Sequence, residues 1–460
     1  MKKTIAMLLA VVMVLGLCAC GSKAPAETTK APETTAAPET TAAPETTAAP
    51  ETTAAPTASG SVYWLNFKPE SDEALKEIAA LYTQKTGVPV EIVTAAAGTY
   101  NETLTAEMDK SNPPTMFVVG NQAAVDTWGE YCLDLTGTDI ANELSTDAYM
   151  LYDKDGKLCS IGYCYECYGI IVNTALLEKA GYARDYIKNF ETLKEVAEDV
   201  HARADELGFD AFTSAGMDGG SSWRFTGHLI NLEYYYESVD DPAAWTSCPA
   251  ELTGKYMDNY RALYDLMVVN SLTDRADLAN GGFDANAEFA DGKAMFYVNG
   301  NWEWSSLQEK GMKAEDLTMI PYYCGVEGEE KAGVNCGTEN YWAVNAEAKE
   351  EDIQATLAFM KWLVTDPEAS EKAVATFGVM PYKHAAESTN PFFAGANAYL
   401  ANGCYNMWWA TNYQPNVDAY RAAVVSAMNQ YNADPTDANW EQVVTAFING
   451  WAVQYQAANG

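Results

Sequence analysis

The sequence has few basic residues: 28 Lys and Arg stand against 64 Asp and Glu, and the formal net charge of the 460 residues is −36. Sequence-independent binding to nucleic acid needs clustered Lys and Arg, so this charge excludes nucleic acid as a partner. The charge also disfavours attachment to anionic lipid through a basic patch. Histidine is scarcer still, with three residues far apart in the chain. A His-rich metal site is therefore not expected, and no metal or cofactor is implied.

Motifs of the common enzyme classes are missing as well. The sequence holds no GxSxG, HExxH or P-loop pattern, and no GxGxxG after a strand, in a suitable context. A glycoside hydrolase needs two carboxylates about 5–10 Å apart, but an acidic chain supplies carboxylates whatever its function. The sequence therefore gives no positive sign of an enzyme, and a glycoside hydrolase stays open as the enzyme alternative.

The ten cysteines do not form a convincing redox or metal motif. Cys164 and Cys167 make one CxxC, but they lie in the apolar run 162–173, which is typical of a strand. A redox thiol usually has its pKa lowered at a helix N-terminus, and a single CxxC is a weak sign of metal binding. The eight cysteines that follow the leader region either stay free and buried or form disulfides, for which about 105 pairings exist.

An apolar run of 14 residues at 4–17 is too short to cross a membrane and suits the core of a signal peptide. Cys20 follows Ala19 directly after this run, which resembles the lipobox of bacterial lipoproteins. The resemblance implies that residues 1–19 are a signal peptide and that Cys20 carries the acyl chains, palmitate among them, of a membrane anchor. An ordinary secreted protein without an anchor is the alternative.

Residues 20–60 are predicted to be a disordered linker. The motif APETTA repeats with a period of six residues through residue 54. Such a segment has little to bury and does not offset its ordering entropy. In an extended, polyproline-like form, at about 3.1 Å per residue, it would reach about 120 Å. We therefore expect a tether that holds a globular part away from the outer face of the cell membrane, in a Gram-positive bacterium.

Strands and helices alternate in the globular part. Short apolar segments predict strands at 62–65, 88–93, 116–119, 169–172, 293–298 and near 342–344. Apolar residues at helical spacing predict helices at 75–82, 103–108, 176–180, 190–207 and 353–364, and over most of the last 45 residues. The order strand, helix, strand, helix, strand predicts a parallel α/β sheet, whose ligands lie beyond the carboxyl ends of the strands. In the first part of the chain those ends are the loops 66–70, 97–100 and 120–122.

Four segments together carry a family resemblance. They are 156–181, with YCYECYGIIVN; 289–304, with FADGKAM before NGNWEW; the glycine-bearing 333–345; and 362–369, with WLVTDPEA. Their order and spacing, with the lipobox and the linker, resemble the family 1 extracellular solute-binding proteins of carbohydrate ABC importers, the group that contains maltose-binding protein. The resemblance covers essentially all of 61–460.

This resemblance implies an α/β fold with two lobes joined by a hinge of crossing strands, the type II periplasmic-binding-protein-like fold. Lobe one would span 61–167 and 333–378, and lobe two would span 168–332 and 379–460. A carbohydrate, as an oligosaccharide, would bind between the lobes of a monomer. The lobes would close around it, and the closed form would dock on the permease subunits of an ABC importer.

Two other receptors stay open as alternatives. The segment 119–122 lacks the acidic residue that is common in the family after this strand, so the ligand need not be a maltose-like sugar. The acidic surplus keeps a non-sugar solute, and a cationic one in particular, in consideration. A receptor linked to a membrane sensor is equally compatible, because no short motif distinguishes docking on a sensor from docking on a permease.

Sugars are recognised by aromatic faces and by planar polar groups, because a buried hydroxyl left unpaired costs about 1–3 kcal/mol. The resemblance implies that Glu166 is a ligand-binding carboxylate near the hinge and that Trp302 is an aromatic platform. The other expected ligand contacts are Trp223 after a glycine-rich loop, at least one of Glu339, Asn340, Tyr341 and Trp342, one of Trp408 and Trp409, and the loop residues Asn66, Lys68, Asn121 and Gln122.

Each of these residues also has a structural interpretation. A Trp is often part of a core, and Asn66, Lys68, Asn121 and Gln122 suit ordinary turns. The remaining tryptophans that we assign to packing are Trp64, Trp304, Trp362, Trp440 and Trp451.

Overall fold

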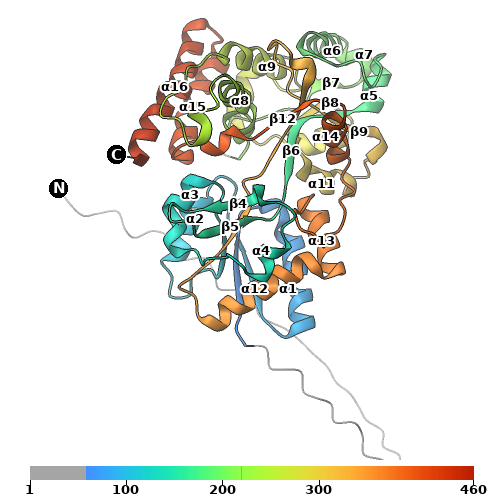
Figure 1. Cartoon of the computed structure of the whole chain (residues 1–460). Helices are drawn as coiled ribbons and strands as arrows, with labels where there is room; N and C mark the ends of the chain where they lie inside the picture. The colour runs from blue at the N-terminus through green and yellow to red at the C-terminus, as the bar shows by residue number, and fades with distance from the viewer. Residues whose placement is uncertain (1–58, 219, 460) are drawn as a thin grey trace, which may run out of the picture. The chain divides into compact units, whose positions relative to one another are not determined.

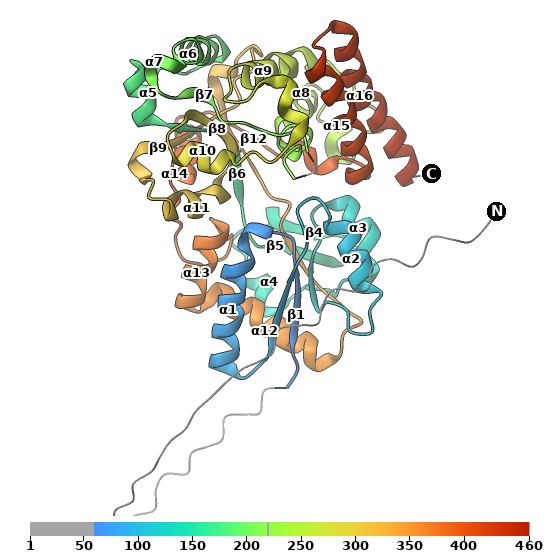
Figure 2. The same cartoon turned by 180° about the vertical axis from the view of Figure 1, so that it is seen from behind.

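The computed structural model describes residues 59–218 and 220–459. The expected signal peptide, Cys20 and nearly all of the expected linker lie outside these ranges. The described residues belong to one compact unit, Pro56–Gly460. In the described part of the chain, no helix combines the length and the apolar character that a membrane span requires. This unit has two lobes, one above the other in Figure 1 and Figure 2, as expected for a two-lobed α/β fold.

Lobe one is built on a six-stranded sheet with the order β2-β1-β3-β11-β5-β4. The parallel strands predicted from the alternating pattern are β1 Val62–Asn66, β2 Val90–Thr94 and β3 Met116–Val118. Three antiparallel strands complete the sheet: β11 Tyr341–Val344, β5 Leu158–Gly162 and β4 Met150–Tyr152. Its helices are α1 Asp72–Thr86, α2 Tyr100–Met108, α3 Gln122–Trp128, α4 Asp139–Glu143, α12 Glu350–Thr365 and α13 Pro367–Phe377.

Lobe two is built on a second sheet with the order β12-β10-β6-β8-β7, and β9 also pairs with β6. Its strands are β6 Glu166–Asn173, β7 Asp210–Phe212, β8 Ala294–Gly300, β9 Leu317–Ile320, β10 Ala332–Gly337 and β12 Tyr405–Met407. All eight residues of the central strand β6 are buried. Separate hydrophobic clusters on its two faces explain this burial, with Ile170 in one cluster and Ile171 in the other.

The helices of lobe two cover both faces of this sheet (Figure 1). They are α5 Thr174–Ala180, α6 Phe190–Ala202, α7 Ala204–Leu207, α8 Asn231–Asp240, α9 Met257–Val269, α10 Ala285–Ala290, α11 Trp304–Glu309, α14 Pro391–Ala401, α15 Val417–Ala433 and α16 Asp437–Asn459. The last two are the helical C-terminal region predicted from the sequence. Trp440 and Trp451 of α16 are buried in the core, as expected for packing residues.

The chain crosses between the lobes at three places, and each differs from the lobe borders expected from the sequence. Residues 163–165 link β5 to β6, so lobe two begins at Glu166 and not at 168. Strand β10 pairs with β6 and β12, so the return to lobe one follows Gly337 and not residue 333. The third crossing follows Ala386 and not residue 378, because Tyr382 is part of the lobe-one core and Ala385 and Ala386 pack against it. In each case buried hydrophobic residues between the expected border and the observed border pack in the core of the lobe to which the sequence did not assign them.

Candidate ligand-binding site

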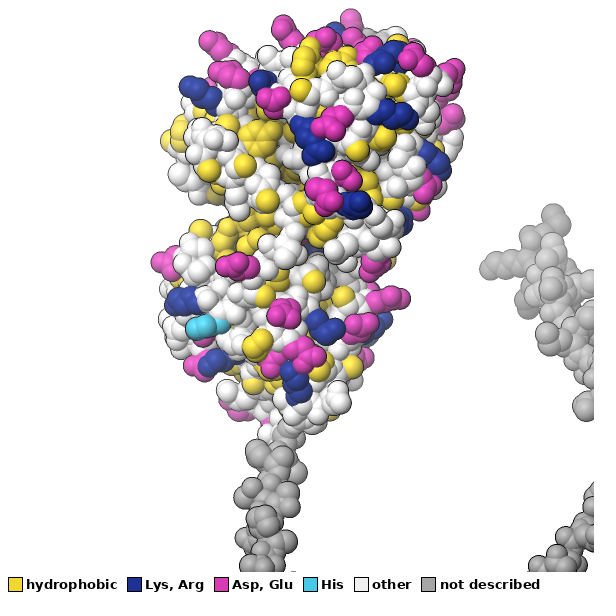
Figure 3. Space-filling model, turned by 90° about the vertical axis from the view of Figure 1, so that its right-hand side faces the viewer, with side chains coloured by type: hydrophobic (Ala, Val, Ile, Leu, Met, Phe, Trp, Pro, Cys, Tyr) yellow, Lys and Arg dark blue, Asp and Glu magenta, His cyan; other side chains and the backbone are white. Residues whose placement is uncertain are grey.

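A cavity of about 920 Å³ lies between the two lobes. Figure 3 shows the hollow from the side, with hydrophobic side chains gathered where the lobes meet. Its volume is near the upper end of the range of about 300–1,000 Å³ that is usual for small-molecule sites. The loops that follow β1, β2 and β3 line it from lobe one, as the strand ends predicted. The polar and aromatic residues of lobe two come from segments far apart in the sequence.

The lobe-one wall is made largely of small residues. Ala96, Ala97 and Gly98 line it after β2, and Gly120 and Asn121 line it after β3. The Asn121 side chain caps helix α3, because its Oδ1 accepts a hydrogen bond from the backbone N–H of Ala124 at 2.9 Å. Larger side chains on this wall are Phe67, Lys68, Glu70, Tyr100 and Trp128. The small residues leave room for a ligand to approach the backbone.

The lobe-two wall carries two tryptophans. Trp223 and Trp302 have ring centroids 5.9 Å apart, and both line the cavity. Trp302 lies in the short 3-10 helix η7 Asn301–Glu303, which follows β8. A Cβ at Gly300 would lie 2.2 Å from the Trp302 ring, so only glycine lets this ring fold back over the end of the strand. The sequence NGNW therefore encodes an aromatic surface that faces the cavity.

A polar network behind Trp302 holds this turn. The Asn301 Oδ1 atom accepts a hydrogen bond from the backbone N–H of Cys167 at 2.8 Å. Glu303 accepts hydrogen bonds from Asn299 and Asn286 at 2.9 and 2.6 Å. Burial raises the pKa of the Glu303 carboxyl, although nearby Arg224 opposes the shift. These contacts tie the turn to β6 and fix the direction of the Trp302 ring.

Arg421 and His228 add polar groups to the same wall. His228 lies in the π-helical turn η4 Arg224–Leu229, and Arg421 lies on α15. The Arg421 Nε–H donates to Gln414 Oε1 at 2.8 Å, which leaves the end of the guanidinium free to face the cavity. A Cβ at Gly227 would lie 2.8 Å from Arg421 Nη2, so the glycine gives the guanidinium the space it occupies.

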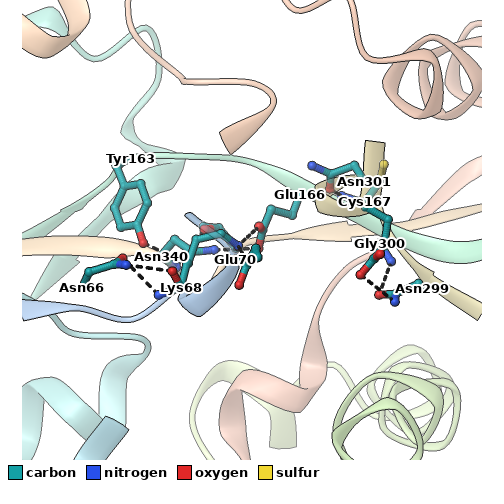
Figure 4. A network of polar contacts seen from close by, with 12 residues as sticks. Asn66, Lys68, Glu70, Tyr163, Glu166, Cys167, Asn299, Gly300, Asn301 and Asn340 are labelled. Atoms are coloured by element: carbon teal, nitrogen blue, oxygen red, sulfur yellow. Dashed lines mark hydrogen bonds and ion pairs between the residues drawn. The ribbon is translucent and has the colours of Figure 1, made fainter. Parts of the chain in front are cut away.

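Lys68 and Glu166 form a buried ion pair at the hinge (Figure 4). Lys68 Nζ donates to Glu166 Oε1 at 2.6 Å, and Asn340 Nδ2 donates to Glu166 Oε2 at 2.6 Å. Tyr163 donates in turn to Asn340 Oδ1 at 3.1 Å. Lys68 is 5% exposed and Glu166 is 2% exposed. The pair therefore joins the β1 loop of lobe one to the first residue of β6.

Burial opposes both charges of this pair. For Lys68, the attraction of Glu166 and Glu70 outweighs burial, and its pKa is raised well above the usual value. For Glu166, burial and the neighbouring Glu339 and Glu70 outweigh the attraction of Lys68, and its pKa is raised. Lys68 Nζ also lies 5.3 Å from the centroid of the Trp302 ring, a cation–π contact between the lobes.

Six of the twelve expected ligand contacts line the cavity: Lys68, Asn121, Glu166, Trp223, Trp302 and Glu339. The other six do not, and they are Asn66, Gln122, Asn340, Trp342, Trp408 and Trp409. Asn66 and Asn340 stand behind the wall and support it. The Asn66 amide donates to the backbone oxygen of Lys68 at 2.7 Å, the turn role that was its structural interpretation. Gln122 is exposed and donates to the backbone oxygen of Tyr152 at 2.9 Å.

The positions of three tryptophans correct the expectations for them. Trp342 is 0% exposed, and its ring stacks on Tyr163 with centroids 4.8 Å apart, inside the lobe-one core. It lies there because β11 is inserted between β3 and β5. Trp409 is buried against His228 and Gly337. Trp408 packs on Trp245, so neither of this pair faces the cavity.

Sequence reasoning missed several residues that line the cavity. They are His228, Arg421, Gln414 and Asp418. Most of them lie on helices or turns, where the local pattern reports which face is buried but not what that face meets. Within the described ranges, no group of three or more His, Cys, Asp or Glu residues is arranged to hold a metal ion.

The cysteines of the described part are free thiols, and six of the eight are buried. Burial raises the pKa of Cys164 and of Cys167 well above the usual value. A redox dithiol needs the opposite shift, so these two residues act as small core side chains.

Comparisons with known proteins agree with this architecture. Residues 77–402 match the family described as bacterial extracellular solute-binding protein. The chain therefore belongs to that family. Its members bind solutes outside the cytoplasm. The two-lobed α/β fold of this chain agrees with membership of this family. Among curated proteins, none matches the sequence.

Several solved structures share the fold. RafE in complex with raffinose has a TM-score of 0.65 at 16% identity, covering 85% of this chain and 99% of its own. A sugar transporter protein of Bacillus licheniformis in complex with stachyose has a TM-score of 0.63 at 15% identity. The match covers 85% of this chain and 100% of that protein. A family 1 extracellular solute-binding protein from Bifidobacterium longum subsp. infantis has a TM-score of 0.58 at 16% identity. The match covers 86% of this chain and 100% of that protein.

Proposed function

We propose that this protein is the receptor of an ABC importer and binds a carbohydrate, as an oligosaccharide, between its two lobes. The observation that carries the proposal is the pair of Trp223 and Trp302 rings on one wall of a large interlobe cavity. Sugar C–H faces stack on such rings, and Glu339, Arg421 and Asn121 offer partners for hydroxyl groups. The volume of about 920 Å³ suits several sugar units better than one.

The ligands of the related structures support an oligosaccharide. Raffinose is bound in the RafE complex, and stachyose is bound in the Bacillus licheniformis protein. Binding would draw the lobes together, because the ligand touches both walls and stabilises the closed population over the open one. Lys68 is suited to couple the lobes, since it contacts Glu166 at the hinge and Trp302 on lobe two.

The delivery step is proposed from the sequence and the family. A lipid anchor on Cys20 would hold the protein at the outer face of the cell membrane, and residues 20–60 would give it reach. A closed monomer would then dock on the permease subunits. Docking on a membrane sensor is the alternative for this step.

A cationic solute is the second candidate ligand. Four carboxylates line the cavity: Glu70, Glu166, Glu339 and Asp418. Only two permanently cationic side chains, Lys68 and Arg421, line it as well. Lys68 is already paired with Glu166 and Glu70, so Glu339 and Asp418 stay available to a positive charge. A sugar hydroxyl can donate to the same carboxylates, and the tryptophan pair favours the sugar.

A thermal-shift screen of the purified protein tests the proposal, with raffinose, stachyose and maltotriose as ligands and spermidine and amino acids as comparisons. A ligand at about 100 times its Kd stabilises the folded state by about 2.7 kcal/mol, which raises the melting temperature visibly. We expect a shift with at least one oligosaccharide, recovery of that sugar unchanged, and loss of the shift in Trp302→Ala. Recovery of cleaved sugar would mean a hydrolase. A shift with spermidine alone would favour the cationic solute.

A further inference from the structure

His228 lies deep in the lobe-two wall and is enclosed by aromatic rings. It is 8% exposed, and its ring stacks on Tyr168 with centroids 4.4 Å apart and an interplanar angle of 15°. Trp223, Trp302 and Trp409 surround it at centroid distances of 5.4, 5.7 and 4.9 Å. Packing from these sides fixes the plane of the imidazole, so its nitrogens have fixed directions.

Within residues 59–218 and 220–459, the imidazole nitrogens of His228 have no hydrogen-bond partner. Neither one hydrogen-bonds to another described residue, and neither belongs to the polar atoms that are sealed away from solvent. Because His228 lines the cavity, its polar edge is open to the cavity. A ligand group that hydrogen-bonds here replaces water at the imidazole edge, whereas a ligand that covers this edge without a hydrogen bond leaves the nitrogens unpaired.

The surroundings of His228 keep the ring neutral. Burial lowers its pKa well below the usual value, and Arg421 of α15, Lys68 of the β1 loop and Arg224 of η4 lower it further. The groups that face it from β6 do not reverse this effect, since the Tyr168 phenol stays neutral and Glu166 is paired with Lys68. A neutral imidazole has one donor and one acceptor nitrogen, so it pairs with a hydroxyl in either role.

We propose that His228 is a specificity-determining residue that hydrogen-bonds a neutral hydroxyl group of the ligand and disfavours a positively charged group beside it. The inference rests on the proposed function, and it assigns the polarity of the ligand at one point of the cavity. A sugar unit stacked on Trp302 would present its hydroxyl groups at its edge, and the His228 ring centroid lies 5.7 Å from that of Trp302. The cations around the ring would repel an ammonium group at the same point.

Histidine NMR tests the proposal directly, because the chain has only three histidines. His201 and His384 are paired with Asp210 and Glu143 and do not line the cavity, so they serve as internal references. Their signals can be assigned with His201→Gln and His384→Gln. We expect the His228 signal of the purified, 15N-histidine-labelled protein to show a neutral ring at about pH 6. It should move when raffinose, stachyose or maltotriose binds, while the reference signals stay in place.

Variants give the second readout. His228→Phe keeps the ring stacked on Tyr168 but removes both nitrogens, and we expect it to weaken binding of the sugar that the thermal screen identifies by about 10- to 100-fold. His228→Gln, which offers one donor and one acceptor, should lose less than about 10-fold. The matched control His201→Phe should bind like the unmodified protein. If His228→Phe folds poorly, the affinity of His228→Gln and the NMR shifts of the unmodified protein test whether His228 contacts the ligand.

Several outcomes would overturn the inference. If a sugar binds but neither moves the His228 signal nor binds more weakly to His228→Phe, His228 is only a core residue and the proposed function stands. If none of the three sugars binds, the proposed function and this inference fail together. If spermidine binds and moves the His228 signal, the ligand is cationic at this point and both are wrong.

Discussion

The two walls of the cavity are made from different kinds of residue. The lobe-one wall consists of loops at strand ends, with small residues such as Ala97, Gly98 and Gly120, and a helix capped by Asn121. The lobe-two wall carries Trp223, Trp302, His228 and Arg421, which come from η4, η7 and α15. The lobe-one wall leaves space for a ligand to approach the backbone. The lobe-two wall presents apolar ring surfaces and polar groups without partners in the described part of the chain.

This difference suggests a division of roles between the lobes. Aromatic side chains contribute most of the free energy at binding sites because they bury much area at little entropic cost. The lobe-two wall should therefore provide most of the affinity and specificity. Lobe one should close over the bound ligand, and its small residues would let the two walls approach. The predictions below test this comparison, beginning with the largest expected effect.

Removing the hinge carboxylate should have the largest effect, on stability. Glu166→Gln leaves the ammonium group of Lys68 buried beside a neutral amide, with only the partly exposed Glu70 as counter-charge. Breaking one side of a buried ion pair costs about 3–5 kcal/mol, and we expect about 3 kcal/mol of the free energy of unfolding to be lost. Urea unfolding followed by tryptophan fluorescence measures this loss.

The matched control is the double variant Lys68→Met/Glu166→Leu, which removes both charges and should be close to the unmodified protein in stability. If Glu166→Gln instead unfolds within about 1 kcal/mol of the unmodified protein, the pair is a surface-like contact and does not link the lobes.

The second prediction compares one tryptophan from each wall. Trp302→Ala removes the ring that lies over Gly300 and should weaken oligosaccharide binding by about 100-fold. Trp128→Ala, on the lobe-one wall, should weaken it by less than about 10-fold. Isothermal titration calorimetry with the sugar found in the thermal screen measures both. A larger loss for Trp128→Ala would reverse the proposed division of roles.

The third prediction concerns how each lobe responds to pH. Glu233 of α8 is fully buried in lobe two, and burial with the neighbouring Glu237 raises its pKa to about 10. The usual pKa of a Glu is 4.5, so between these values the folded state holds a proton that the unfolded state releases. Stability from this group is complete at low pH and falls by up to about 1.4 kcal/mol per pH unit as the pH rises towards 10.

One carboxylate of lobe one, Asp72, should behave in the opposite way. Hydrogen bonds from Lys76 and Thr94 lower the pKa of Asp72 in α1, so its contribution is complete at neutral pH and is lost in acid. We expect Glu233→Gln to flatten the loss of stability between about pH 4.5 and 10 and to leave unfolding below this range unchanged, as measured by urea unfolding across the pH range. Parallel pH profiles for Glu233→Gln and the unmodified protein would contradict a neutral Glu233.

The smallest effect should come from Gln122, which the sequence suggested as a ligand contact. Its side chain is exposed and bonds to the backbone of Tyr152, away from the cavity. Gln122→Ala should change ligand affinity by less than about 2-fold, as measured by calorimetry. A large loss of affinity in Gln122→Ala would place the ligand outside the cavity described above.

The neighbouring Asn121 differs, because its side chain caps α3. Asn121→Ala removes this cap and should cost about 1 kcal/mol of the free energy of unfolding.

The sequence predicted the site best where a residue follows a strand. Lys68 and Asn121 follow the neighbouring parallel strands β1 and β3 within three residues, and both line the cavity. The carboxyl ends of neighbouring parallel strands meet at one edge of a sheet, so position in the chain sets position in space. His228 and Arg421 lack such a relation to a strand end, and the sequence did not single them out.

The segment 339–342 shows where the sequence was not specific enough. The polar and aromatic stretch 339–342 predicts a residue at the ligand, and Glu339 does line the cavity. Trp342, three residues later, lies in a strand whose four residues are all buried. Which side chains of a short strand meet a ligand depends on the strands beside it, and the sequence of 339–342 does not specify that β11 pairs with β3 and β5.

The sequence by itself determined the class of the protein: an acidic α/β chain whose strand-end loops form one wall of a site, with residues 20–60 separate in composition from the fold. These properties follow from local composition and periodicity, which act over a few residues. The tertiary structure decided which tryptophans face the cavity, that Lys68 is paired with Glu166, and that His228 lies open among aromatic rings. Those contacts join segments from different parts of the chain, and only packing brings them together.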